Sequence, residues 1–396
     1  MSDRKLRLLT FSTLFPNAAA PYHGVFVENR LRHLLASGEA ESRVIAPVPW
    51  FPSANPRFGS YATYAKAPRR EERHGIDIDH PRYPLLPKIG MTVAPALLYL
   101  WALPAVRRLL ASGYDFDLID AHYFYPDGVA AALIARRLGK PFTVTARGTD
   151  INLIPRHALP RRQILWTAAR ADGMITVCQA LKDEMVELGV EADRVTVLRN
   201  GVDLKMFRMQ DRAALRARYG LDGPTLISVG HLIERKAHDL VIEALPHLPG
   251  HTLLIAGEGP EEAKLRALAD RLGVTDRVQF LGRRPHEELP DLYGAADILV
   301  LASSREGWAN VLLEAMACGT PVVASNVWGT PEVVAAPEAG RLMRERSGIA
   351  IAESAKELFA NLPDRAATRL YAERFSGDAT TQGQLDLFRA ILARKA

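Results

Sequence analysis

Short, continuous apolar runs alternate with longer amphipathic segments along most of the chain. Runs such as 118–121 and 298–301 are apolar at nearly successive positions, which is typical of parallel strands buried on both faces. The runs that predict strands are 6–11, 43–48, 76–80, 117–121, 142–146, 173–178, 195–198, 225–229, 251–256, 277–281, 297–301 and 321–324. The amphipathic segments that predict helices include 127–138, 179–188, 260–272 and 309–317. This alternation, completed twice, predicts an α/β protein of two doubly wound domains.

A turn signal separates the two series of strands. Residues 199–203 read Arg-Asn-Gly-Val-Asp, and a charged helical segment at 211–219 follows before the next strand. A length of 396 residues also favours two domains. We therefore expect one domain over 1–203 and a second over 204–379. Open parallel sheets bind ligands beyond the carboxyl ends of their strands, so polar residues there are the candidates for a site.

The composition is that of a soluble globular protein, with 48% hydrophobic and 24% charged residues. Cys178 and Cys318 lie in apolar strand or helix contexts, which argues against a disulfide framework and against a zinc site. The first apolar run, at 6–11, is too short for the core of a signal peptide. These features predict a cytoplasmic protein whose thiols stay reduced.

The positive charge is concentrated in the first half of the chain. Residues 1–200 hold 26 Lys and Arg against 19 Asp and Glu, out of 50 and 45 in the whole chain, whose net charge is +5. Such a half is either a solvated basic surface or a contact for an anionic partner, such as phospholipid, a lipid diphosphate or an acidic sugar. Nucleic acid is not expected, because no known binding module is present.

Two segments of the first half leave alternatives open. Residues 89–106 contain no charged side chain and include two prolines. They form a core helix, an interfacial element that would hold the protein peripherally on a membrane, or a membrane span. Residues 47–56, which are rich in proline and aromatic side chains, form either a rigid surface loop or a contact for an acceptor sugar or a membrane.

The strongest candidate site is a pair of glutamates. Glu306 and Gly307 belong to a loop after a predicted strand, and Glu314 lies on the helix that follows. The apolar neighbours of Glu314 predict that this helix is largely buried, and a buried carboxylate needs a partner. The two carboxylates could bind the hydroxyls of a sugar and of a ribose. They could also be the acid and the nucleophile of a glycoside hydrolase, since sequence spacing does not give their separation.

A basic loop follows the first strand of the second domain. Gly230 and His231 precede two adjacent cations, Arg235 and Lys236. Arginine offers a planar fork of donors and lysine a mobile point charge, a combination that suits a diphosphate, although the loop could also be a solvated turn. A helix is predicted to begin directly after the loop that contains Glu306. The backbone N–H groups at its start can also bind an anion. A hydrolase needs neither feature, so both favour a transferase.

Together these motifs resemble the family-4 retaining glycosyltransferases, which have the two-domain GT-B fold. The resemblance covers almost the whole chain and is strongest at about 140–335. It implies a Rossmann-like acceptor-side domain over 1–203 and a Rossmann-like nucleotide-sugar donor domain over 204–379. It also implies that a C-terminal helix, at about 380–396, packs back on the first domain.

By the same resemblance, Glu306 contacts hydroxyls of the donor sugar and Glu314 accepts hydrogen bonds from the ribose. Arg235 and Lys236 hold the diphosphate, whereas His231 stands where many relatives have an arginine. The other residues expected near the nucleotide are Gly230, Gly257, Gly259, Leu281, Gly282, Arg283, Gly307, Asn310 and Val311. The glycine loops among them are alternatively structural turns.

The first domain departs from the family pattern at one place. The sequence Arg-Gly-Thr-Asp ends at Asp150, where the family usually has His-Gly-x-Asp with its histidine at the donor sugar. Arg147 cannot act as a neutral acid–base group, so we expect it to hold a phosphate or to stabilise the leaving group. Asp150 is a substrate ligand or a loop cap, His122 faces the cleft, and Asp127 caps a helix. We expect Gly24 to contact the donor or the acceptor through its backbone.

The resemblance implies retaining transfer of a sugar from a nucleotide diphosphate sugar, expected to be a UDP-sugar. The expected acceptor is a hydroxyl of a lipid-linked saccharide or of a growing polysaccharide. No cofactor is expected, and no metal, because the Asp-x-Asp patterns at 77–79 and 115–117 lack a supporting constellation. The alternatives are a sugar phosphorylase or nucleotide-sugar isomerase on the same fold, and a non-catalytic subunit that binds a nucleotide sugar.

Overall fold

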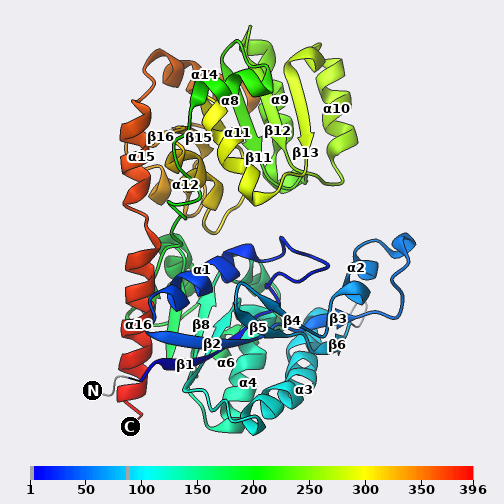
Figure 1. The fold of residues 1–396 in the computed structure, drawn as a ribbon, viewed down its shortest axis with the longest axis vertical. Coiled ribbons are helices and arrows are strands. Elements are labelled where there is room, and N and C mark those ends of the chain that lie inside the picture. Colours follow the sequence, from blue (N-terminus) through cyan, green and yellow to red (C-terminus); the bar gives the residue numbers. More distant parts are fainter. Residues whose placement is uncertain (1–3, 86–89, 396) are drawn as a thin grey trace. The chain divides into compact units, whose positions relative to one another are not determined.

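The computed structural model describes residues 4–85 and 90–395, and these divide into two compact units (Figure 1). Unit 1 contains the chain up to Arg199 together with the segment from Asp378 onward, and unit 2 is Asn200–Gly377. The sequence placed these two boundaries at 203 and 379, a few residues further along. Each unit is an α/β body with its own sheet, as the alternating runs predict.

Unit 1 is built on an eight-stranded sheet with the order β10-β9-β8-β7-β1-β2-β5-β4. Its strands are β1 (Leu6–Phe11), β2 (Ala40–Ile45), β4 (Arg70–Arg73), β5 (Ile76–Asp79), β7 (Leu118–His122), β8 (Phe142–Ala146), β9 (Gly173–Thr176) and β10 (Val195–Val197). Every adjacent pair is parallel except β4 with β5. A separate parallel pair joins β3 (Val48–Trp50) to β6 (Arg82–Pro84). The order reverses at β1 and β7, so a ligand crevice is expected where these two strands end.

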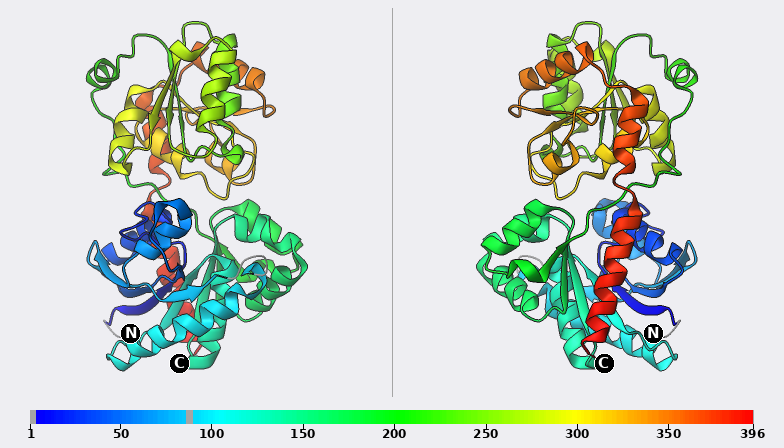
Figure 2. Two further views of the ribbon diagram at one scale, coloured as in Figure 1. Left: turned by 90° about the vertical axis from the view of Figure 1, so that its right-hand side faces the viewer. Right: turned by 90° about the vertical axis from the view of Figure 1, so that its left-hand side faces the viewer.

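Helices cover both faces of this sheet (Figures 1 and 2). On one face lie α1 (Val25–Ala36) and α16 (Gly377–Ala393). On the other face, α3 (Gly90–Ala111), α4 (Val129–Leu138) and α6 (Ala158–Ala168) pack against one another. The other helical segments of unit 1 are α2 (Ser60–Lys66), α5 (Thr149–Asn152), α7 (Gln179–Glu187), η1 (Pro56–Phe58), η2 (Phe124–Gly128), η3 (Ile154–Arg156) and η4 (Ala192–Arg194).

Unit 2 has a six-stranded, entirely parallel sheet with the order β13-β12-β11-β14-β15-β16. Its strands are β11 (Thr225–Val229), β12 (Thr252–Ala256), β13 (Val278–Gly282), β14 (Ile298–Leu301), β15 (Val322–Ser325) and β16 (Gly340–Met343). Its helices are α8 (Arg212–Tyr219), α9 (His238–Ala244), α10 (Glu262–Arg271), α11 (Leu289–Ala295), α12 (Asn310–Ala317), α13 (Thr330–Val333), α14 (Gly348–Ala360) and α15 (Arg365–Glu373). Short turns are η5 (Glu234–Lys236), η6 (Leu245–His247), η7 (Thr275–Arg277) and η8 (His286–Glu288).

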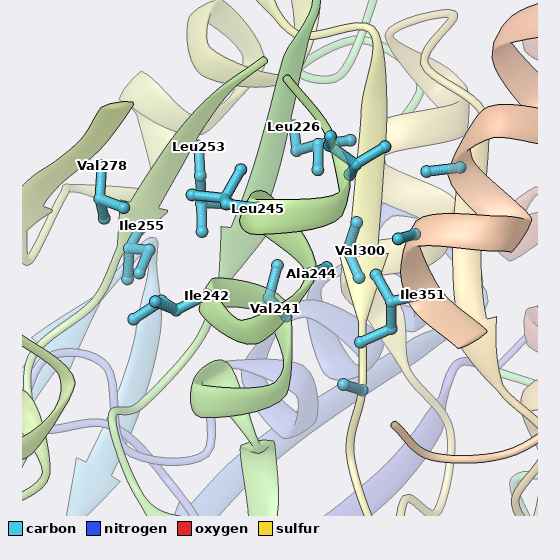
Figure 3. Packing of buried hydrophobic residues seen from close by; sticks show 14 of the residues in the cluster. Leu226, Val241, Ile242, Ala244, Leu245, Leu253, Ile255, Val278, Val300 and Ile351 are labelled. Atoms are coloured by element: carbon cyan, nitrogen blue, oxygen red, sulfur yellow. The ribbon is translucent and has the colours of Figure 1, made fainter. Parts of the chain in front are cut away.

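The core of unit 2 lies between its sheet and two flanking helices (Figure 3). Val241 of α9 and Ile351 of α14 are fully buried against strand residues such as Leu253 and Val300, which are also fully buried. Burying one such side chain stabilises the fold by about 1.5–3 kcal/mol. The continuous apolar runs of the sequence therefore form strands of this sheet, and a sheet whose two faces are both covered requires such runs.

The C-terminal helix α16 completes the core of unit 1. Leu385, Phe388 and Ile391 are buried in the same cluster as Leu8 of β1 and Leu31 of α1. A polar contact adds to this packing, because the Arg30 guanidinium donates from Nε to the side-chain oxygen of Gln384 over 2.9 Å. The last helix thus belongs to the first unit although it follows the second in sequence.

The apolar segment expected at 89–106 forms most of α3, although residue 89 lies outside the described residues. Within the described chain, α3 is the one helix long and apolar enough to cross a membrane by length and composition, and 33% of its most apolar window is buried. Leu98, Ala102 and Val106 are buried, whereas Leu100 is 55% exposed. The helix therefore packs on the sheet along one side and presents apolar side chains along another.

Four strands were not predicted from the sequence. They are β3, β4, β6 and β16, which have three or four residues each and include exposed or half-buried positions. Short edge strands lack the continuous apolar run on which the prediction depends. The proline-rich segment 47–56 contains β3 and continues into η1, so part of it pairs with β6.

We predict that Phe388→Ala destabilises unit 1. Phe388 is fully buried, so removal of its ring leaves a cavity and should lower the free energy of unfolding by about 3–5 kcal/mol. Urea unfolding followed by circular dichroism measures the change. Leu159→Ala, at a 44% exposed position of α6, is the matched control and should change stability by less than about 0.5 kcal/mol. Equal stability of the Phe388 variant and the wild type would contradict the role of α16.

Candidate functional site

The basic loop and the glutamate loop of unit 2 are joined where the strand order of its sheet reverses. The first follows β11 and the second follows β14, which are neighbouring strands. The backbone N–H of Ser304 donates to the carbonyl of Arg235 over 2.9 Å, and Arg235 Nη1 donates to the carbonyl of Arg305 over 2.8 Å. Both loops therefore lie at the topological switch point, where open sheets of this kind bind ligands.

Glu306 is held by the two cations of the basic loop. Lys236 Nζ lies 2.6 Å from Glu306 Oε1, and Arg235 Nη1 lies 3.6 Å from Oε2. Glu306 is only 8% exposed, and burial opposes its ionisation, but Lys236 and Arg235 outweigh burial and hold the pKa of this carboxyl below its ordinary value. Two cations against one carboxylate leave a surplus positive charge at the loop, which suits an anionic ligand.

Glu314 is fixed by two side chains that the sequence did not reveal. His286 Nε2 donates to Glu314 Oε1 over 3.2 Å, and the Tyr293 hydroxyl donates to Oε2 over 3.1 Å. Burial lowers the pKa of His286, but the contact with Glu314 outweighs it and raises that pKa above its usual value. Phe207 packs edge-on against the imidazole with ring centroids 5.1 Å apart. Glu314 is thus oriented before any ligand arrives.

Two positions in the predicted nucleotide loops have no room for a side chain. A Cβ on Gly257 would lie 1.9 Å from the Gly230 carbonyl oxygen, and one on Gly259 would lie 2.3 Å from the Leu232 oxygen. Backbone bonds hold the two loops this close, since Gly230 N–H donates to Ala256 and Leu232 N–H to Glu258. Close loop packing therefore requires glycine at both positions, and contact of these glycines with a nucleotide stays a prediction.

The remaining donor-side candidates surround these loops. Gly257 N–H donates to the Gly282 carbonyl over 2.9 Å, which ties the loops after β12 and β13 together next to Leu281. Arg283 forms an exposed ion pair with Glu258 at 2.8 Å, and His231 is exposed.

The helix α12 begins at Asn310, directly after the glutamate loop. Asn310 and Val311 are its first two residues, and no side chain caps this end. The N–H groups of Asn310 and Leu312 donate to the carbonyls of Trp308 and Ala309, each over 3.1 Å, which leaves the Val311 N–H at this helix start as a donor for a ligand. The Asn200 backbone oxygen accepts from the indole N–H of Trp308 over 3.1 Å, so this start is anchored to the first residue of unit 2.

A second polar cluster, within unit 1, centres on Arg147. Arg147 Nη2 donates to His122 Nδ1 over 2.7 Å, and His122 Nε2 lies 3.2 Å from Asp120 Oδ2. Thr143 donates its hydroxyl to the other oxygen of Asp120 over 3.0 Å. Burial lowers the pKa of His122, and the neighbouring Arg147 lowers it further, while Asp120 opposes both. The chain of contacts is therefore that of a neutral histidine, protonated at Nε2, between an arginine and an aspartate.

Arg147 itself is only 9% exposed, so its guanidinium is held in place. Burial lowers the pKa of Arg147, yet arginine stays protonated because its ordinary value is so high. Its carbon Cζ lies 5.4 Å from the ring centroid of Phe26, a cation–π arrangement. The guanidinium stands just after β8 and keeps a fixed positive charge there.

Asp150 makes the contacts of a loop cap, the second of the two roles that the sequence left open, and its role as a substrate ligand stays a prediction. Its carboxylate accepts from the backbone N–H groups of Phe124, Arg147 and Gly148 over 2.7–3.0 Å. These bonds shape the turn that presents Arg147.

The interpretation of Asp127 as a helix cap is wrong. It accepts from the backbone N–H of Thr13 over 2.7 Å and from the Thr13 hydroxyl over 2.9 Å, so it closes the loop after β1. The residue at the N-cap of α4 is Gly128, which offers no side-chain cap. Gly24 borders the same loop. A Cβ there would lie 2.3 Å from the carbonyl of Leu14, and the left-handed φ of +72° also favours glycine.

Two family descriptions match almost the whole chain between them. Glycosyltransferase Family 4 matches residues 25–206, and Glycosyl transferases group 1 matches residues 211–375. The chain belongs to family 4 of the glycosyltransferases. The resemblance stated from the glutamate and basic-loop motifs is confirmed.

Curated relatives carry several names. A D-inositol 3-phosphate glycosyltransferase of Mycobacterium tuberculosis is 37% identical over 71% of this chain and 62% of that protein. The enzyme of the same name from Mycobacteroides abscessus is 35% identical over 58% and 55%. An N-acetyl-alpha-D-glucosaminyl L-malate synthase of Bacillus anthracis is 27% identical over 69% and 75%. The chain thus spans little more than half the length of the first of the curated relatives it matches.

Solved structures share the architecture of this glycosyltransferase-family chain. Sucrose-phosphate synthase from Thermosynechococcus elongatus has a TM-score of 0.77 over 99% of this chain and 100% of that chain, at 21% identity. HepE of Anabaena in complex with UDP-glucose has a TM-score of 0.74 over 98% and 100%, also at 21% identity. At such identities the likeness concerns the fold, and the predicted GT-B fold is confirmed.

The two Asp-x-Asp patterns of this family-4 chain serve ion pairs. Asp77 and Asp79 pair with Arg43 and Arg70, and Asp115 pairs with Lys140. Asp117 pairs likewise with Arg4, at the start of the described chain. Across residues 4–85 and 90–395 the structure brings together no group of three or more His, Cys, Asp and Glu side chains that could hold a metal ion.

We predict that Asp127 makes stability depend on pH. Burial outweighs its hydrogen bonds and raises the pKa of Asp127 from 3.8 to about 7. Folding therefore retains a proton that the unfolded chain loses. This contribution is complete below about pH 4 and is lost as pH rises to about 7, with a slope of at most about 1.4 kcal/mol per pH unit. Urea unfolding of wild type and Asp127→Asn at several pH values gives the difference.

The Asn variant cannot ionise, so its stability relative to the wild type should rise between pH 4 and 7. Asp193→Asn, at an exposed position of η4, is the control and should follow the wild type throughout. Curves for the wild type and Asp127→Asn that stay parallel across this range would contradict the assignment.

Proposed function

We propose that this protein is a retaining glycosyltransferase that moves a sugar from a nucleotide diphosphate sugar to a hydroxyl acceptor. The observation that carries this proposal is the Lys236–Glu306–Arg235 cluster at the switch point of unit 2, beside the start of α12. It combines a surplus cation, a helix N-terminus with the Val311 N–H, and a carboxylate. A diphosphate leaving group needs the first two, and sugar hydroxyls need the third.

The proposed mechanism follows from how charge develops. As the bond from sugar to diphosphate breaks, the leaving diphosphate gains negative charge, and Arg235, Lys236 and the N-terminus of α12 stabilise it. Lys236 is then drawn from Glu306 toward the phosphate oxygens. The freed carboxylate of Glu306 accepts from the sugar hydroxyls and orients the reacting carbon. The acceptor hydroxyl attacks the face from which the diphosphate departs and gives its proton to an oxygen of the leaving diphosphate, and no metal or cofactor takes part.

The donor that we propose is a UDP-sugar, with Glu314 as the ribose acceptor. HepE, which shares this fold, was solved with UDP-glucose, in line with that proposal. His286 and Tyr293 would serve by holding Glu314 in the orientation that the ribose hydroxyls require. Preorganised acceptors of this kind lower the cost of binding.

The acceptor side that we propose is unit 1, with Arg147 as its fixed cation. The names of the relatives refer to inositol 3-phosphate and to malate, both of which are anionic. Held by His122 on a buried strand end, Arg147 would suit a phosphate of the acceptor or of the donor. We propose a lipid-linked saccharide or a growing polysaccharide as the acceptor, in the cytoplasm and at the inner face of a membrane.

A phosphorylase or isomerase on the same fold, and a non-catalytic subunit, are the alternatives. A subunit without turnover would not need the carboxylate and both cations together, yet the chain retains all three. This favours an enzyme. A requirement for inorganic phosphate would identify a phosphorylase. Turnover without an acceptor would identify an isomerase.

We predict that nucleotide diphosphates stabilise the protein without added metal. UDP or a UDP-sugar should raise the melting temperature, and Lys236→Ala should abolish most of that rise while leaving any shift by uridine unchanged, because the nucleoside lacks the diphosphate. Lys264→Ala, at an exposed lysine of α10 in the same unit, is the control. If no nucleotide or nucleotide sugar shifts the folded wild type, the donor-site assignment fails.

We also predict that Glu306→Gln lowers kcat/KM by about 100-fold or more. The amide keeps the shape but loses the charge-assisted hydrogen bonds to the sugar and the pairing with Lys236. Release of nucleotide diphosphate during turnover gives the rate. Glu345→Gln, at an exposed position of unit 2, should keep the wild-type rate. Near wild-type turnover by the Glu306 variant would refute this site.

A further inference from the structure

The helices α3, α4 and α6 form one surface of unit 1 with an unusual charge pattern. We call it the arginine face and define it by the exposed arginines of these three helices, which are Arg107, Arg108, Arg136, Arg137, Arg161 and Arg162. The sequence of the three helices contains no Asp and no Glu. None of the six arginines forms an ion pair with any residue that the structure describes. The face therefore keeps a net positive charge, although Arg108 also lines a pocket with Glu71, Asp77 and Asp79.

Apolar side chains stand on the same surface. Leu100 and Trp101 of α3 are 55% and 45% exposed, and Leu159 of α6 is 44% exposed. Pro104 is also exposed and lies on the same side of α3 as Leu100, four residues earlier, so it extends this apolar stripe. Arg107, three residues further on and exposed as well, borders the stripe with a positive charge. Large exposed apolar side chains gathered in one place mark a contact surface in soluble proteins.

We propose that the arginine face is a docking surface for an anionic phospholipid bilayer. A tryptophan and a leucine on a helix flanked by arginines match the interface of a membrane, where the ring and the aliphatic chain enter the headgroup layer and the cations meet lipid phosphates. Clustered arginines near an anionic leaflet attract it strongly, and six of them are available here. The inference deepens the proposed function, on which it rests for the idea of a membrane-bound acceptor.

Two other occupants fit less well. Nucleic acid would use the arginines but has no use for the aliphatic stripe of α3. A second copy of this chain would bring a second arginine face, and six unpaired cations on each side would repel. A bilayer uses both the charge and the apolar stripe.

The test measures binding of the full-length protein to vesicles by sedimentation. Vesicles of phosphatidylcholine are compared with vesicles of equal parts phosphatidylcholine and phosphatidylglycerol. We expect binding to the anionic vesicles only, weakened by salt because exposed charges are screened. Arg107→Gln with Arg108→Gln should reduce the partition coefficient by about 10-fold or more. Leu100→Ser with Trp101→Ser should reduce it by a similar factor, with no added salt dependence.

Matched controls lie in unit 2. Arg271→Gln with Arg344→Gln removes two exposed arginines, and Leu370→Ser removes a leucine that is 66% exposed, and both variants should bind as the wild type does. Failure of the wild type to bind anionic vesicles at low salt overturns the proposal. So does equal loss in the control variants, tighter binding to duplex DNA than to vesicles, or a dimer that the α3 variants dissociate.

Stabilisation by UDP-sugar, measured on the same samples, separates this inference from the proposed function. Variants of α3 that lose vesicle binding but keep the nucleotide shift support the docking surface and show an intact fold. A wild type that responds to nucleotide but ignores vesicles overturns the docking surface alone. A wild type that binds vesicles but no nucleotide overturns the proposed donor site alone.

Discussion

A carboxylate that is almost removed from water has to be compensated, and Glu306 is compensated by a loop 70 residues earlier. The ion pair with Lys236 joins the ends of β11 and β14, which the sheet already makes neighbours. Because the two cations outnumber the carboxylate, the same contact that satisfies Glu306 also leaves a charge for a ligand. Binding can then exchange one partner for another without exposing a bare charge.

In both units, neighbouring polar side chains orient a charged side chain, although the charged group is a cation in one unit and a carboxylate in the other. In unit 1 the buried Arg147 is oriented by His122 and Asp120, and in unit 2 Glu314 is oriented by His286 and Tyr293. In each case, contacts with neighbouring side chains fix the orientation of a charged side chain when the protein folds. The conformational entropy of that side chain is therefore lost on folding. The fold itself therefore holds both charged side chains in place.

The sequence predicted those parts of the structure that depend on local patterns. Strands such as 142–146 and 225–229 were found at their observed bounds, because all five residues of each are buried and none of them is charged. The Glu306 and Lys236 loops were found by motif. His286 and Tyr293 were missed because their role exists only in space, 28 and 21 residues before Glu314. Asp127 was misread since a local cap and a distant loop contact look alike in sequence.

The last helix places a condition on how the chain comes to be made. Unit 1 is synthesised first, but Leu385, Phe388 and Ile391, which close its core, emerge only after all of unit 2. At the ribosome, the usual order in which the leading domain finishes first is therefore reversed here. Unit 2 can therefore reach its final packing while unit 1 still exposes the apolar side chains that α16 later covers. A chaperone that binds the nascent chain would then bind unit 1.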